Sequence, residues 1–198
     1  MGEIGPVALP RPMRADARRN YDRLVTAARA AFAEQGAEAS LDDIARRAGV
    51  GPGTLYRHFP TRLALLEAVY RDDVTALCTQ AEELARAEPP EQALAAWMRT
   101  FVRYATGKRG LVAALKETLG EQTTPFFTEC STALRAAAGM LLTAAQQAGA
   151  VRTEANVPDL LKLVHGISVV TEHAIDDPGQ ADRLLSVVLD GLRPTLPA

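Results

Sequence analysis

SLDDIARRAGVGPGTLYRHFPTR, the sequence of residues 40–62, contains two short helical segments separated by a glycine. Ser40 and Asp43 form a capping box, in which the serine oxygen accepts a hydrogen bond from a first-turn amide and the acid reaches back. This box predicts a short helix that ends at about Ala48. Gly49 follows, and because glycine adopts a positive φ at little steric cost, it predicts a tight turn.

The segment after the turn, from about residue 51 to residue 59, predicts a second short helix that Pro60 ends. Two helices cross at the angle of a helix-turn-helix only where the crossing residue is small, and Ala45 meets that requirement. The second helix would pack its apolar side chains inward and leave its polar ones on the surface. These outward residues, which can contact phosphates and base edges, are Thr54, Tyr56, Arg57 and His58.

The run from Leu41 to Arg62 resembles the DNA-binding signature of the TetR family of bacterial transcriptional regulators. The similarity covers residues 18 to about 70, and the rest of the chain matches only in length and helix count. The resemblance implies an all-α fold, with an N-terminal three-helix helix-turn-helix domain followed by a larger helical bundle. It also implies that this bundle binds a ligand and forms the dimer.

The resemblance assigns roles to individual residues by their positions. Thr54, Tyr56 and His58 resemble the phosphate- and base-contacting residues of the family's recognition helix. Ser40 resembles the cap whose hydroxyl and amide meet a phosphate. Arg62 resembles the basic residue at the start of the fourth helix that touches the DNA backbone.

Some positions depart from the family pattern. Gly51 and Pro52 stand where many members carry a long polar side chain, and neither can make a bidentate hydrogen bond to a base. Two acidic residues also occupy positions of the first short helix where a cation often sits. Sequence readout is therefore expected to rely on Arg57 and Tyr56, on contacts with thymine methyl groups and on DNA shape.

The N-terminal third of the chain is its basic end. Residues 1–65 carry a formal charge of +3, with arginine as their only cation, whereas the remainder carries −5. The first 15 residues hold three prolines and no apolar period, which predicts a flexible arm. A basic cluster lies at the end of this arm, where contact with phosphate or the minor groove is the alternative to a solubilising role. It consists of Arg11, Arg14, Arg18 and Arg19.

Apolar residues at spacings of three and four predict helices along the rest of the chain. One helix is expected from Asp16 to about Gly36, and a long one after Thr61. Glycine and proline separate further expected helices over 91–105, 109–119, 123–148, 157–175 and 179–192. The expected organisation, with about nine helices, is an arm over 1–15, a DNA-binding domain over 16–62 and a ligand-binding and dimerisation domain over 63–198.

Aromatic residues recur at helical spacing in the expected second domain. Such stripes are more often core than pocket, but the resemblance implies a mostly apolar ligand cavity. The residues expected to line it are Trp97, Phe101, Tyr104, Phe127 and His165, with a core or interface position as the alternative for the histidine. The last two helices carry apolar stripes too wide for a solvated face. The resemblance implies that they form a four-helix homodimer interface.

Several other classes of protein fit the sequence less well. The longest stretch without a charge has 16 residues, against about 20 needed to span a bilayer, and the N-terminus lacks the order of a signal peptide. Cys78 and Cys130 lie far apart without a CxxC motif, which fits neither a disulfide framework nor a zinc site. We therefore expect no membrane association, no metal and no cofactor, in a reducing cytoplasm.

The main hypothesis is a homodimeric DNA-binding transcriptional regulator, specifically a repressor that a small-molecule ligand releases from a palindromic operator. One alternative is a helical small-molecule binding protein or enzyme whose helix-turn-helix is only a scaffold. The sequence offers that alternative no nucleophile–base pair, phosphate loop or paired carboxylates on an expected buried face. The other alternative is an activator of the same family.

Overall fold

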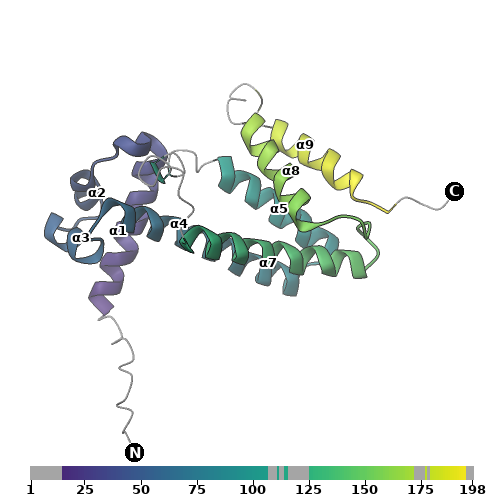
Figure 1. Ribbon diagram of the computed structural model, residues 1–198, viewed down its shortest axis with the longest axis horizontal. Coiled ribbons are helices and arrows are strands. Elements are labelled where there is room, and N and C mark those ends of the chain that lie inside the picture. Colours follow the sequence, from purple (N-terminus) through teal and green to yellow (C-terminus); the bar gives the residue numbers. More distant parts are fainter. Residues whose placement is uncertain are drawn as a thin grey trace, which may run out of the picture.

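The computed structural model describes residues 15–106, 111, 114–115, 125–171, 177 and 179–194, and every regular element among them is helical (Figure 1). The all-α fold is thereby confirmed. Most of the expected arm over 1–15 and most of the expected helix over 109–119 lie outside the described residues. The elements are α1 (Ala15–Gln35), η1 (Gly36–Glu38), α2 (Leu41–Arg47), α3 (Pro52–His58), α4 (Arg62–Ala87), α5 (Pro90–Thr106), α7 (Pro125–Gln147), α8 (Val157–Val170) and α9 (Gln180–Gly191).

Helices α1, α2 and α3 gather around the start of α4 at one end of the molecule (Figure 1). Their apolar faces form a core in which Phe32, Ile44 and Leu55 are almost completely buried. Helix α4 adds Leu65 and Leu66 from its first turns, and both are fully buried. Burying a large apolar side chain is worth about 1.5–3 kcal/mol, so this shared core fixes α1, α2 and α3 against α4.

The chain between α5 and α7 also contributes to this N-terminal core. Leu111, Ala114 and Leu115 are buried in the same cluster as Phe32 and Leu66. Residues far along the chain thus complete the core beneath the helix-turn-helix.

The second core joins α4, α5, α7, α8 and α9, which form the other end of the molecule (Figure 1). Trp97 of α5 is fully buried there, and its indole N–H donates to the carbonyl oxygen of Leu77 in α4 over 3.0 Å. Helix α4 belongs to both cores, since Val69 lies in the first and Val74 in the second. It is therefore the rigid connection between them.

Helix α8 covers 157–170 of the expected range 157–175, and the last four residues of that range lie outside the described residues. It starts after Asn156, whose side chain accepts a hydrogen bond from the Asp159 amide over 3.0 Å, and it ends at Val170. Its last residues are β-branched, and such residues lower helix propensity because they lose side-chain freedom against the preceding turn. Thr171, at the C-cap, is the third β-branched residue in succession.

Candidate DNA-binding surface

The turn between α2 and α3 has the expected geometry. The Ser40 hydroxyl accepts a hydrogen bond from the Asp43 amide over 3.4 Å, and Gly49 has a φ of 65°. The Val50 amide donates to the Ala45 carbonyl over 3.0 Å, which closes the end of α2. Ala45 is fully buried, as its position at the helix crossing requires. The capped helix and the glycine turn predicted from the sequence are both present.

A contact from α1 fixes this turn, and the sequence pattern did not indicate it. Nη2 of Arg23 donates to the Gly49 carbonyl oxygen over 3.1 Å. A Cβ atom at Gly49 would collide with the same guanidinium group. Glycine is therefore favoured here by its positive φ, and a larger residue would also make the Arg23 side chain move away from the turn.

Helix α3 presents the expected side chains outward. Tyr56 is 48% exposed and Arg57 is exposed, whereas Thr54 is half-buried. Leu55 and Phe59 are buried and attach the helix to the N-terminal core. The exposed face therefore offers a phenol, a guanidinium and a hydroxyl.

His58 lies at the edge of an aromatic cluster rather than freely in solvent. Its ring centroid is 6.3 Å from that of Tyr21 and 6.2 Å from that of Phe59. Tyr21 and Phe59 are themselves 5.1 Å apart. Partial burial in this cluster raises the pKa of the Tyr21 phenol, with a further contribution from the Asp72 carboxylate. His58 is half-buried, which leaves part of its imidazole accessible from the surface.

Arg62 lies at the start of α4, as expected, and its side chain also interacts with other residues of the protein. Its Nη1 donates to the Ala39 carbonyl oxygen over 2.6 Å, and its guanidinium carbon lies 5.2 Å from the centroid of the Phe32 ring. These contacts hold the segment before α2 against α1 and α4. Contact between Arg62 and a DNA phosphate remains a prediction.

The cations around the turn differ in whether an acid neutralises them. Arg46 pairs with Asp43 over 2.7 Å, and Arg47 pairs with Glu34 over 2.7 Å. By contrast, Arg18 and Arg57 are exposed and form no ion pair with any described residue. Free cations at these two positions are available to phosphates or bases without a competing intramolecular partner. Arg11 and Arg14 lie outside the described residues.

The residues expected to line a ligand cavity do not form one group. Trp97 and Phe101 are buried with their ring centroids 5.5 Å apart, and the Trp97 indole N–H donates to the Leu77 carbonyl oxygen rather than facing a cavity. Phe127 packs against both cores beside Tyr70. His165 lies on an exposed part of α8.

Tyr104, the remaining expected residue, lines an open cavity of about 460 Å³ between α4 and α5. Leu77 and Asp73 contribute from α4, and Thr100 and Arg103 contribute from α5. Burial raises the pKa of the Tyr104 phenol, so it is a neutral hydrogen-bonding group at physiological pH.

Helices α8 and α9 leave a group of large apolar side chains exposed. Val170 and Val187 are 65% and 69% exposed. Exposed apolar side chains on two neighbouring helices are typical of a protein interface. The others in this group are Leu163, Val169 and Leu184.

Two classes of feature are missing from the part of the chain that the structure describes. It holds no cluster of histidine, cysteine and acidic side chains suited to a metal ion. None of its helices combines the length and apolar character needed to cross a bilayer.

Comparison with known protein families divides the chain into two matched parts. Residues 24–69 match the family described as bacterial regulatory proteins, tetR family. Residues 89–194 match the C-terminal domain described as transcriptional regulator SbtR-like. The second match alone covers more than half of the chain.

Individual relatives agree with these matches. The HTH-type transcriptional regulator SAB2452 of Staphylococcus aureus is 38% identical over 73 residues, which span 36% of this chain and 40% of that protein. The crystal structure of the TetR transcriptional regulator SCO0520 from Streptomyces coelicolor has a TM-score of 0.79 and 41% identity, covering 89% of this chain and 99% of that one. The crystal structure of the TetR transcription regulatory protein from Mycobacterium vanbaalenii has a TM-score of 0.76 and 40% identity, and the match covers 92% of this chain and 100% of that one.

Proposed function

Because this chain belongs to the tetR family of bacterial regulatory proteins, we propose that it is a homodimeric repressor that a small-molecule ligand releases from a palindromic operator. Regulators of this family bind DNA and small-molecule ligands and typically dimerise. The observation that carries the DNA-binding part is the exposed face of α3, where Tyr56 and the unpaired Arg57 project beyond a buried Leu55.

In this proposal α3 enters the major groove. Tyr56 and Arg57 contact base edges, whereas Thr54, His58 and the Ser40 cap contact phosphates on either side. Arg18, an unpaired cation at the start of α1, reaches the adjacent backbone, and so does Arg62 at the start of α4. A Cβ atom at Gly51 or Gly53 would meet nothing within 4 Å, so the start of α3 leaves open space for a phosphate to approach its backbone.

The homodimer forms through α8 and α9, whose exposed valines and leucines are covered by the same surface of a second copy. A two-fold interface of this kind places the two α3 helices on one side of the dimer and requires a palindromic site. The exposed His165 lies on α8 near this surface, which favours an interface position for it over a place in a ligand cavity.

Ligand release acts through α4 in this proposal. The cavity between α4 and α5 contains Asp73, which also forms an ion pair with Arg29 of α1 over 2.6 Å. A ligand that binds better to one orientation of α4 shifts the population toward that orientation. Because α3 packs in the same core as the start of α4, a shift of α4 moves α3. The distance between the two α3 helices of the dimer then changes.

The decisive experiment is selection from a randomised DNA duplex pool by the purified protein at near-physiological salt, followed by sequencing of the retained DNA. We expect an enriched palindrome with half-sites about one helical turn or more apart. If the folded dimer enriches no sequence, even after refolding from denaturant to remove any copurified ligand, the proposal is wrong.

A further inference from the structure

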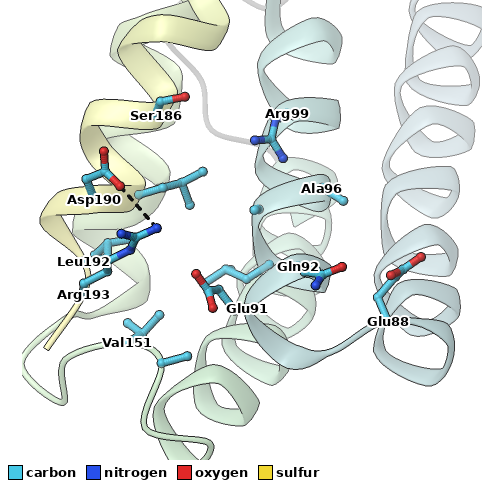
Figure 2. A pocket seen from close by; sticks show the side chains of 14 residues that line it. Glu88, Glu91, Gln92, Ala96, Arg99, Val151, Ser186, Asp190, Leu192 and Arg193 are labelled. Carbon is cyan, nitrogen blue, oxygen red and sulfur yellow. Dashed lines mark ion pairs between the residues drawn. The ribbon is translucent and has the colours of Figure 1, made fainter.

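A cavity of about 550 Å³ lies between α5 and α9 (Figure 2). The residues that line it do not include the aromatic residues expected to bind a ligand. The loop between α7 and α8 closes one end of it with Val151, which is buried. This loop is fixed in place, because the Arg152 amide donates to the Leu192 carbonyl at the end of α9 over 2.8 Å. The cavity is therefore built by three elements that are held together.

Two stripes of side chains face each other across the cavity. On α5, Gln92, Ala96 and Arg99 recur at intervals of three and four, and on α9, Ser186 and Asp190 lie about one turn apart, with Arg193 just beyond the end of that helix. Residues at such intervals share one helix face. Ala95 and Ala96 lie in the middle of the α5 stripe, and their small side chains account for the hollow there. Leu189 provides an apolar wall on the opposite side.

The charges in the cavity are separated along α5. Glu91 lies at one end and points toward α9, and Arg99 lies two turns further along the helix (Figure 2). Neither side chain forms an ion pair with any residue that the structure describes. At a rise of 1.5 Å per residue, their backbone positions are about 12 Å apart. The half-buried Arg99 thus has a charge that nothing in the described structure balances.

The α9 side of the cavity does not compete for these two charges. Asp190 and Arg193 pair with each other over 3.5 Å, as the dashed line in Figure 2 marks. The Ser186 hydroxyl donates a hydrogen bond to the Asp182 backbone carbonyl oxygen over 2.9 Å. Of the charged residues that line the cavity, Glu88, Glu91 and Arg99 thus have no ion-pair partner among the described residues, and Glu91 and Arg99 are the two that α5 carries.

The cavity also faces a different direction from the proposed dimer interface. With 100° between successive residues of a helix, Ser186 points about 160° away from the exposed Leu184 and about 100° away from Val187, whereas Asp190 lies only about 60° from Val187. A partner subunit that covers the two apolar side chains therefore leaves the Ser186 side of the cavity open to solvent.

We propose that this cavity binds an elongated organic zwitterion, an ω-amino acid in which an apolar chain separates a primary ammonium from a carboxylate. The ammonium pairs with Glu91, the chain lies against Ala95, Ala96 and Leu189, and the carboxylate pairs with Arg99. Charge-assisted hydrogen bonds of this kind are about twice as strong as neutral ones, and a guanidinium can bind a carboxylate through two parallel hydrogen bonds. The site is independent of the DNA-binding surface.

Isothermal titration calorimetry of the full chain with 8-aminooctanoate, octanoate and octylamine tests the proposal. We expect 8-aminooctanoate to bind at least tenfold more tightly than either compound with a single charge. Arg99→Gln and Glu91→Gln should each weaken its binding at least tenfold. Arg135→Gln is the matched control, because Arg135 is an exposed arginine of α7 that lines neither cavity, and it should leave the affinity unchanged.

Thermal unfolding of each variant shows whether it is folded. Both substitutions should leave the melting temperature within a few degrees of the wild type, because Glu91 is exposed and Arg99 forms no ion pair with a described residue. Three results would each overturn the proposal. They are no binding of 8-aminooctanoate, equal binding of all three compounds, and unchanged binding by the folded Arg99→Gln variant.

Discussion

Nε of Arg29 donates to Oδ1 of Asp73 over 2.6 Å and so joins α1, in the N-terminal core, to the middle of α4. The same guanidinium pairs with Asp72. The Asp73 side chain is only 9% exposed, and it also lines the cavity between α4 and α5. One carboxylate thus contacts both the helix that supports the DNA-binding surface and the space in which a ligand would act on α4.

Replacing Arg29 with Gln should loosen this connection. The change removes a charged hydrogen-bond donor from the nearly buried carboxylate of Asp73, so we expect the free energy of unfolding to fall by about 1–3 kcal/mol and operator affinity to fall with it. Urea denaturation and DNA titration measure the two effects. Arg19→Gln, which removes an exposed ion pair with Asp16, is the control and should change stability by less than about 1 kcal/mol. Equal effects of the two substitutions would contradict this interpretation.

Substitution of the exposed residues on α3 should affect DNA binding without affecting folding. We expect Arg57→Ala and Tyr56→Ala each to weaken operator binding by about 1–3 kcal/mol and to relax the base preference at one position. Arg86→Ala removes a comparable exposed arginine at the far end of α4, where it pairs with Glu82 over 3.1 Å. DNA titration of all three variants at fixed salt tests the assignment, which fails if the α3 variants, still folded, bind as tightly as the Arg86 variant.

Gly49→Ala should be more costly than the same change at Gly149. Both glycines have a positive φ, of 65° and 71°, and a left-handed conformation costs a residue with a Cβ atom about 1–2 kcal/mol. At Gly149 the new methyl group meets nothing within 4 Å, whereas at Gly49 it displaces Arg23. Loss of that hydrogen bond adds about 1 kcal/mol. Chemical denaturation of both variants gives the difference. In the Arg23→Ala background, where this hydrogen bond is already absent, Gly49→Ala should cost no more than Gly149→Ala costs in the wild type.

Stability should decline in alkaline solution. Burial raises the pKa of the Cys130 thiol and of the Tyr70 and Tyr104 phenols, so the folded state keeps these protons at pH values where the unfolded chain loses them. The resulting stability is fully present below the unfolded values, 9.0 for cysteine and 10.0 for tyrosine, and is lost as the pH rises through the folded ones. Denaturation at several pH values from 8 to 11 measures the slope.

Tyr104→Phe should make this decline shallower above pH 10, because the variant lacks one of the groups that cause it. Phe101→Leu perturbs the same region without removing a titratable group, so it should lower stability at every pH and leave the slope as it is in the wild type. Identical slopes for the Tyr104 variant and the wild type would mean that this phenol does not contribute.

The proposed dimer interface can be tested with two neighbouring residues of α9. Val187→Glu places a charge on the exposed apolar surface and should produce monomers, since burying an unpaired carboxylate costs several kcal/mol. Ser186→Glu adds the same charge on the side of α9 that lines the cavity and should leave the dimer intact. Analytical ultracentrifugation distinguishes the two results, and a Val187→Glu dimer would exclude this surface as the interface.

The sequence predicted the helix-turn-helix well because its signals are local. A capping serine, a small crossing residue and a glycine turn act over a few neighbouring positions, so Ser40, Ala45 and Gly49 were sufficient. The contacts of Arg23 and Arg29 could not be predicted in this way, because each links residues that are 26 or 44 positions apart.

The aromatic residues show a second limit of sequence reasoning. Trp97 and Tyr104 lie on the same helix face two turns apart, yet one is core and the other lines a cavity. The difference depends on which side chains of α4 oppose them, and periodicity along α5 carries no information about that. The cavity between α5 and α9 escaped prediction for the same reason, since its walls come from three separated segments.

The burial of Leu111, Ala114 and Leu115 beneath the helix-turn-helix has a consequence for attempts to divide the protein. A fragment that ends with the fourth helix would expose the apolar surface that these three side chains cover. A chimera that joins the N-terminal domain to the C-terminal domain of another regulator must therefore carry these residues, or close substitutes, along with it. The unit that evolution can exchange in this protein is discontinuous in sequence.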